Sequence, residues 1–187
     1  LTIVLAGGSA ILEIDIKKII ALSTLSQLGV IIMVLGAQEP NLAFFHLLRH
    51  AYFKAILFIC AGILIHNIKD FQDIRRMGGV NTSIPSAFRV IIVANLRLCG
   101  LPFLRGFYSK DMILESLIII DYGIFVFFFA IVATFLTVAY SCRLRFLLGG
   151  LNFIKEDLSS IDDYDFFILT GIYILIPFSI FGGILIS

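Results

Sequence analysis

The sequence predicts an all-α protein, a polytopic transmembrane helix bundle of about six spans that forms a single domain over residues 1–187. Of the 187 residues, 60% are hydrophobic and 14% are charged, whereas soluble domains average about 45–50% and about 25%. Three stretches without a charged residue hold 20, 21 and 22 residues: Ile19–Gln38, Tyr122–Cys142 and Phe166–Ser187. About 20 apolar residues suffice to cross a bilayer as a helix. These runs are continuously apolar, whereas membrane β-barrel strands alternate polar and apolar residues over about ten positions, so helices are favoured.

The expected helices follow one another without an inserted soluble domain. The expected spans are Leu1–Leu12 (the end of one span), Ile19–Ala37, Leu42–His66, Pro85–Ile120, Gly123–Arg143 and Phe166–Ser187. The fourth is interrupted by Gly100-Leu101-Pro102-Phe103-Leu104-Arg105-Gly106. Proline removes a backbone donor and glycine adds freedom, so we expect a broken helix near Pro102.

Charged residues in the loops predict the orientation. Three loops on one side of the membrane carry eight Lys and Arg residues: 17, 18, 69, 75, 76, 143, 145 and 155. The opposite loops, near Glu39 and Asp121, carry none. The positive-inside rule therefore places Lys17/Lys18 and the 67–79 and 149–165 loops in the cytoplasm or, for an organelle inner membrane, in the matrix.

Composition also excludes several classes of function. The net charge of +1 indicates no nucleic-acid partner. Cys60, Cys99 and Cys142 are far apart in apolar stretches, which predicts neither a metal site nor a redox pair. The sequence has no start methionine and no basic leader before a short apolar core, so we interpret it as an internal piece of a longer membrane protein.

The third span carries the strongest candidate site. His46, His50 and Lys54 are spaced by four and share one helix face, each about 6 Å along the axis from the last. An ionisable residue at the centre of a span costs about 2.5–3.5 kcal/mol and is a functional candidate. Histidine titrates near neutral pH, so water between these residues would let the row pass protons. The alternative is a set of interhelical hydrogen bonds without a transport role.

Two further candidates are weaker. Lys110 directly follows the expected break, where free backbone groups make room for water. It is a candidate proton acceptor, with Asp111 and Glu115 as counter-charges, or else a lysine that snorkels to a headgroup. Lys17 and Lys18 open a span whose first turns are polar, which indicates either a polar lane or a basic anchor followed by helix–helix hydrogen bonds. These polar residues are Ser23, Thr24, Ser26 and Gln27.

Four motifs carry a family resemblance. They are Asp15-Ile16-Lys17-Lys18-Ile19-Ile20-Ala21-Leu22-Ser23-Thr24-Leu25-Ser26-Gln27-Leu28-Gly29, Phe44-Phe45-His46 through Lys54, Gln72-Asp73-Ile74-Arg75 with Met77-Gly78-Gly79, and Gly106-Phe107-Tyr108-Ser109-Lys110-Asp111. In this order they resemble the antiporter-like subunits of respiratory complex I, most closely the chain 5 family of NADH–ubiquinone oxidoreductase. Related cation/proton antiporter subunits share the histidine–lysine helix.

The resemblance implies proton pumping across the mitochondrial inner membrane, coupled to NADH oxidation and ubiquinone reduction elsewhere in the complex. It places Lys17, His46, His50, Lys54 and Lys110 on a proton-transfer axis. It implies no NADH, flavin, iron–sulfur or metal site on this chain, and its partners would be the other membrane-arm subunits, lipid and protons. The family's other proton-carrying half lies on helices outside this chain.

Two other hypotheses remain open: a cation/proton antiporter subunit, and a non-functional product of a mitochondrial gene read with the wrong genetic code. Arg49, Arg97 and Arg105 lie at membrane depth, where arginine is costly and where the resembling chains usually carry small residues. Arg89 also interrupts an otherwise apolar half-helix. In invertebrate mitochondria AGA and AGG encode serine, AUA methionine and UGA tryptophan. The sequence has 32 Ile, 3 Met and no Trp, as the standard code would give. An AT-rich, fast-evolving genome is the alternative explanation.

The coding sequence tests the misreading hypothesis. We expect AGA or AGG codons at Arg49, Arg97 and Arg105, and also at Arg89 and Arg76. Serine would then stand at these positions in the translated protein. CGN codons at Arg49, Arg97 and Arg105 would refute the hypothesis.

Overall fold

The structure, a computed structural model, describes residues 1–68, 71–77, 79–100, 105–119, 124–150 and 171. Its elements are α1 (Thr2–Leu12), α2 (Ile16–Gly36), α3 (Pro40–Asn67), the 3-10 helix η1 (Ile74–Arg76), α4 (Val80–Ser83), α5 (Pro85–Cys99), α6 (Arg105–Ile119) and α7 (Ile124–Gly149). The described residues contain no strand beyond a single isolated bridge. The predicted all-α bundle is confirmed; its sixth span, Phe166–Ser187, lies outside the described residues except for Gly171.

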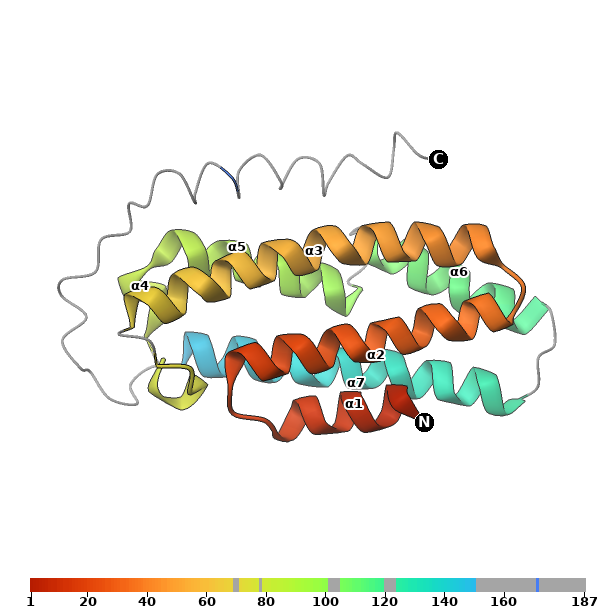
Figure 1. The fold of residues 1–187 in the computed structure, drawn as a ribbon, viewed down its shortest axis with the longest axis horizontal. Helices are drawn as coiled ribbons and strands as arrows, with labels where there is room; N and C mark the ends of the chain where they lie inside the picture. Colours follow the sequence, from red (N-terminus) through yellow and green to blue (C-terminus); the bar gives the residue numbers. More distant parts are fainter. Residues whose placement is uncertain (69–70, 78, 101–104, 120–123, 151–170, 172–187) are drawn as a thin grey trace.

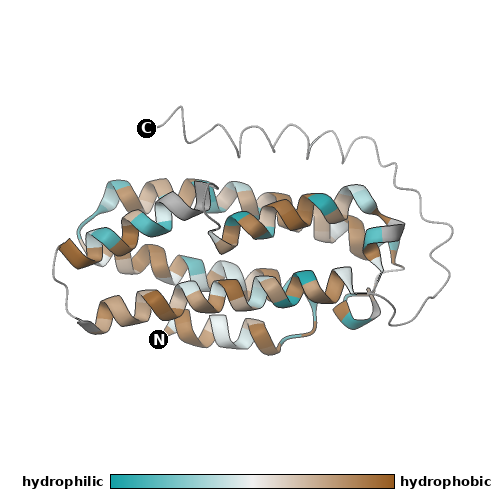
Figure 2. Cartoon of the chain, turned by 180° about the vertical axis from the view of Figure 1, so that it is seen from behind, coloured by the Kyte–Doolittle hydropathy of each residue, from teal (hydrophilic) through white to brown (hydrophobic). Residues whose placement is uncertain are grey.

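Three helices are long and apolar enough to cross a membrane. The apolar segments are Ile16–Gly36, Pro40–Asn67 and Phe125–Gly149, with mean hydropathies of 2.2, 1.6 and 2.2. All three run along the long axis of the bundle (Figure 1). Apolar colouring predominates along the helices (Figure 2), and large side chains such as Phe135 face outward from α7. Outward apolar side chains are what a helix in contact with lipid requires.

Two helices extend past their predicted ends. α2 begins at Ile16, three residues early, so Lys17 and Lys18 lie in its first turn. α7 continues through Arg143 to Gly149. The prediction used the length of charge-free sequence, which indicates only the part of a helix that lies inside the membrane. A charged residue at a helix end reaches water with its long side chain and does not interrupt the helix.

The predicted interruption of the fourth span is confirmed. α5 stops at Cys99 because Gly100 adopts a left-handed conformation with φ 75° and ψ 48°, which favours glycine and ends a helix. The chain becomes helical again at Arg105. Pro102 itself lies outside the described residues. The fourth region is therefore two half-helices of 15 residues each.

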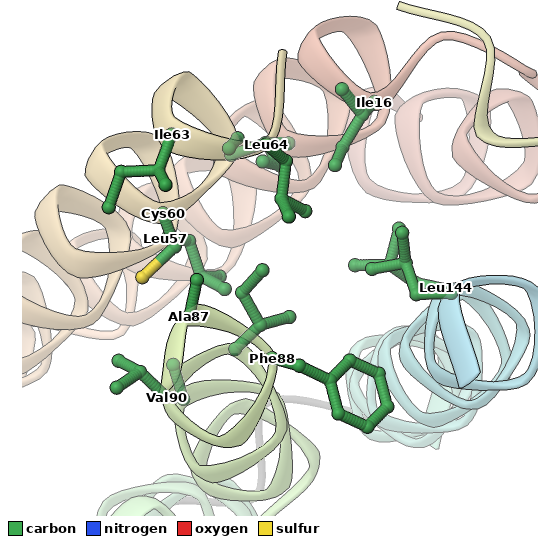
Figure 3. Close-up of a cluster of buried hydrophobic side chains, with 14 of the residues drawn as sticks. Ile16, Leu57, Cys60, Ile63, Leu64, Ala87, Phe88, Val90 and Leu144 are labelled. Atoms are coloured by element: carbon green, nitrogen blue, oxygen red, sulfur yellow. The ribbon is translucent and has the colours of Figure 1, made fainter. Parts of the chain in front are cut away.

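A core of interlocking apolar side chains joins the half-helix α5 to its neighbours. Leu57 and Leu64 of α3, Phe88 of α5 and Leu144 of α7 belong to one buried cluster, and Figure 3 shows their side chains converging between the helices. In a membrane, helices associate through close packing and internal hydrogen bonds. This packing holds the half-helix α5 in place between α3 and α7.

A backbone link ties two loops together at one end of the bundle (Figure 1). Asp15, between α1 and α2, forms an isolated antiparallel bridge with Asp73, which follows α3. The amide of Ile16 donates to the Gln72 carbonyl at 3.1 Å, and the amide of Ile74 donates to the Ile14 carbonyl at 3.1 Å. These bonds fix the N-terminus of α2 relative to the C-terminus of α3, and so hold the two helices in register.

Close packing of α1 on α2 depends on Gly29. A Cβ at Gly29 would lie 2.6 Å from Ile3 Cγ1, whereas a Cβ at Gly62 would meet nothing within 4 Å. We expect Gly29→Ala to destabilise the bundle by about 1–3 kcal/mol because α1 must move. Gly62→Ala should be neutral or stabilising, since alanine favours a helix interior over glycine by about 1 kcal/mol. Thermal unfolding in detergent measures both; equal midpoints for the two variants would contradict the packing argument.

Candidate functional site: a buried lysine–histidine cluster

Helix α3 presents three of its basic side chains to the interior of the bundle. His46, His50 and Lys54 are all buried, and the Lys54 side chain is only 4% exposed. The His46 and His50 rings stack with their centroids 6.5 Å apart and an interplanar angle of 17°. The burial of all three side chains and the stacking of the two rings confirm the shared face that their spacing of four predicts.

Helix α2 binds the buried ammonium group of Lys54. The Nζ atom donates to the Ile20 carbonyl at 3.2 Å and to the Ser23 hydroxyl. The Ser23 hydroxyl in turn donates to the same Ile20 carbonyl at 2.8 Å. A buried cation is tolerated when hydrogen-bond acceptors replace the water it loses.

His46 joins three helices. Its Nε2 lies 3.3 Å from Oε1 of Gln27 on α2, and its Nδ1 lies 3.4 Å from the hydroxyl of Ser109 on α6. Nε2 of His50 is buried and has no hydrogen-bond partner among the described residues. His46 is therefore held on both ring nitrogens, whereas His50 keeps one nitrogen available.

Lys110 lies beside the break between the half-helices. Its Nζ donates to the Leu98 carbonyl at 2.5 Å and to Thr137 Oγ1 of α7 at 3.0 Å. Leu98 is in the last turn of α5, where carbonyls have no helical partner. The interruption thus supplies the acceptor that lets Lys110 remain inside the bundle.

Two small cavities lie beside the histidines and Lys110. One, of about 20 Å³, is lined by residues that include His46, His50, Ser109 and Lys110. The other, also about 20 Å³, is lined by Lys110, Thr134 and Thr137, among others. Each has room for about one water molecule. Gln27 and Lys110 line both cavities.

The other predicted residues lie elsewhere. Lys17 is exposed in the first turn of α2 and makes no hydrogen bond or ion pair within the described part of the chain. Asp111 and Glu115 are exposed, and neither forms an ion pair with Lys110. The structure therefore brings together four of the five predicted site residues, without the expected counter-charges.

Two intramembrane arginines border the cluster. The Arg97 guanidinium lies 5.7 Å from the centroid of the Phe53 ring, and that of Arg49 lies 4.6 Å from the Phe45 centroid. Both arginines line the cavity beside the histidines. Stacking on an aromatic ring is favourable for a guanidinium that has lost part of its water.

Sequence reasoning missed two of the contacting residues. Ser109 and Thr137 bind His46 and Lys110, yet neither was a predicted site residue. A signal was present on α7, where Thr134, Thr137 and Ser141 recur at helical spacing within a charge-free stretch. Polar hydroxyls in register within a span indicate a face turned toward other helices.

Comparison with known proteins identifies the family. Residues 1–137 match the model for the membrane domain described as NADH:quinone oxidoreductase/Mrp antiporter, TM. The chain belongs to this antiporter family. It is 48% identical over its full length to NADH-ubiquinone oxidoreductase chain 5 of Aedes aegypti, covering 32% of that protein, and 47% identical to that of Locusta migratoria, covering 33%. The chain of Phoca vitulina is 45% identical over 95% of this chain and 29% of its own length. The chain thus spans about a third of these relatives.

Within this antiporter-family segment, no group of three or more His, Cys, Asp or Glu residues in the described ranges could hold a metal ion. The imidazole and amine groups of the cluster can exchange protons and form hydrogen bonds, and each of the two cavities has room for about one water molecule.

A matched pair of serines on α2 tests the site of the antiporter-family segment. Ser23 accepts from Lys54, whereas Ser26, equally buried, donates to the Ser23 carbonyl of its own helix at 3.0 Å. We expect Ser23→Ala to destabilise the protein by about 1.5–3 kcal/mol, the scale of a hydrogen bond to a charged group, and Ser26→Ala by less than about 1 kcal/mol. Thermal unfolding in detergent compares them; equal losses would mean that Ser23 does not support a charged Lys54.

Proposed function

We propose that this chain is part of a proton-translocating membrane subunit of NADH:ubiquinone oxidoreductase, respiratory complex I, in the mitochondrial inner membrane. The observation that carries the proposal is the cluster of proton-exchanging side chains buried among helices of membrane length. His46, His50 and Lys54 lie on one helix and Lys110 faces them from another. The names of the chain 5 relatives support the same assignment.

Protons would move between Lys54 and Lys110 through the histidines. Lysine and histidine each bind and release one proton, and a water molecule in the shared cavity would bridge His50 Nε2 to Ser109 and Lys110. Lys54 rests on acceptors of α2, and Lys110 rests on the α5 carbonyl and Thr137. The segment would thus hold a proton at either end of a short path across the bundle interior.

The proposal includes an orientation and a division of labour. The Lys17/Lys18 turn and the 67–79 and 149–165 loops would face the matrix, because they carry the basic residues. NADH, flavin, iron–sulfur clusters and ubiquinone would be bound by other subunits, and this chain would bind other membrane-arm subunits and lipid. Lys17, exposed at the helix end, would meet protons arriving from the matrix.

A cation/proton antiporter subunit is the second candidate, because the matching family model covers Mrp antiporters as well as NADH:quinone oxidoreductases. Rotenone-sensitive NADH oxidation in membranes that contain the full-length protein separates the two. A complex I subunit requires that activity to depend on the protein. An antiporter subunit would instead support cation-dependent proton exchange without NADH.

The role of Lys54 can be tested in the intact complex. We expect Lys54→Ala to lower NADH-driven proton pumping while leaving assembly largely intact, because the change removes a buried charge without adding bulk. Proton uptake per electron in inside-out vesicles measures pumping, and native gel electrophoresis measures assembly.

Lys18 provides the control for this variant. It is exposed and pairs with Asp15 at 2.9 Å, so Lys18→Ala should leave pumping unchanged, since an exposed pair contributes little. An assembled Lys54→Ala complex with a normal proton-to-electron ratio would remove Lys54 from the path.

A further inference from the structure

Gln27 lies between the two cavities of the site, yet its side chain does not exchange protons. Its side chain is 2% exposed on α2 and carries no charge. It lines both water-sized cavities, a property it shares only with Lys110 among their lining residues. Its Oε1 lies 3.3 Å from His46 Nε2. An amide cannot carry a proton onward at neutral pH, so its contribution must act through the histidine.

The two partners of His46 have different hydrogen-bonding abilities. An amide oxygen only accepts, whereas a serine hydroxyl can donate or accept. Because Oε1 of Gln27 faces Nε2, this contact is a hydrogen bond in the tautomer that carries its hydrogen on Nε2, and in that tautomer Nδ1 accepts from the Ser109 hydroxyl. The partner of one ring nitrogen sets the tautomer and so decides which nitrogen is free to react.

We propose that Gln27 is a positioning residue that fixes the tautomer of His46, so that Nδ1, beside Ser109 and the Lys110 cavity, is the atom that exchanges the proton. The proposal rests on the proposed proton-translocating function and extends it to one defined atom. Gln27 acts here as a neutral counterpart of the carboxylate that orients a catalytic histidine.

The proton transfer balances at a single nitrogen. A proton arriving from the Lys110 side binds Nδ1 and gives an imidazolium with hydrogens on both nitrogens, and the Ser109 hydroxyl turns to accept. When Nδ1 releases that proton into the cavity toward His50, which lines it as well, the ring returns to the neutral Nε2–H form. Gln27 keeps the same hydrogen bond throughout, so the cycle needs no rotation of the ring.

The charged and titratable groups around the ring are basic. His50 and Arg49 adjoin it on α3, Lys110 faces it from α6 and Arg97 from α5, and α2 contributes no titratable group to the cavity they line. A neutral amide therefore anchors Nε2 without trapping a proton. A carboxylate in its place would favour the doubly protonated ring.

Two substitutions at Gln27, made in the full-length subunit within the assembled complex, test the proposal. Gln27→Met removes the acceptor at similar volume and leaves both tautomers available. We expect Gln27→Met to lower proton pumping about as much as Lys54→Ala does, while the complex still assembles. Gln27→Glu keeps an acceptor but adds a negative charge. We expect its pumping to persist with a pH profile shifted toward higher pH than that of the unmodified complex.

Gln72 provides matched controls, because it is exposed and its recorded contact with α2 uses the backbone carbonyl. Gln72→Met and Gln72→Glu should leave both the pumping and its pH profile unchanged. Normal pumping in Gln27→Met, or an unshifted profile in Gln27→Glu, would overturn the assignment. If the complex fails to assemble with either Gln27 variant, Gln27 has a structural role and the assignment is also overturned. Normal pumping in Lys54→Ala would refute the proposed function itself. This variant therefore separates failure of the proposed function from failure of the Gln27 assignment.

Discussion

The arrangement of α2 against α3 depends on one constraint, the need to solvate the buried ammonium of Lys54 without water. A lone cation at membrane depth is costly, and a helix backbone normally has no acceptor to spare. Here α2 supplies both the Ile20 carbonyl and the Ser23 hydroxyl. These bonds fix the rotation of α2 about its axis, and the same rotation brings Gln27, one turn further on, against His46. One interaction therefore sets the geometry of the whole polar row.

The break in the fourth region solves the same problem for Lys110 in another way. Instead of a hydroxyl-rich neighbour, the chain ends a helix inside the bundle, and the Leu98 carbonyl in the last turn of α5 accepts from Lys110. Such an end is stable at membrane depth only when it is enclosed by protein. Packing of α5 against α3 and α7 provides that enclosure, because Ala94 and Leu98 near the end of α5 are buried in the same apolar cluster. The apolar core and the polar site thus depend on each other.

Hydropathy, helical spacing and the positions of glycine and proline were enough to predict the described helices, the break and the row on α3, because these depend on local sequence. The row His46, His50 and Lys54 follows from spacing alone. The sequence could not show that Ser109 and Thr137 meet the row, because those contacts depend on how helices far apart in the chain rotate against one another. For Lys17 the sequence predicted too much. The residue belongs to a specific motif, yet its N-terminal position on α2 leaves it exposed and apart from the cluster.

The two arginines beside the cluster bear on how the site could conduct. None of the residues lining the cavity shared by His46 and Lys110 is acidic, while Arg49 and Arg97 both reach it. Two fixed guanidinium groups next to exchangeable bases oppose the arrival of another proton, since like charges in a poorly solvated site repel strongly. Serine at these positions would have the reverse effect, because a hydroxyl both donates and accepts and would hold water where the guanidinium excludes it. The proposed proton path therefore favours small hydroxyl residues at positions 49 and 97, independently of the codon argument.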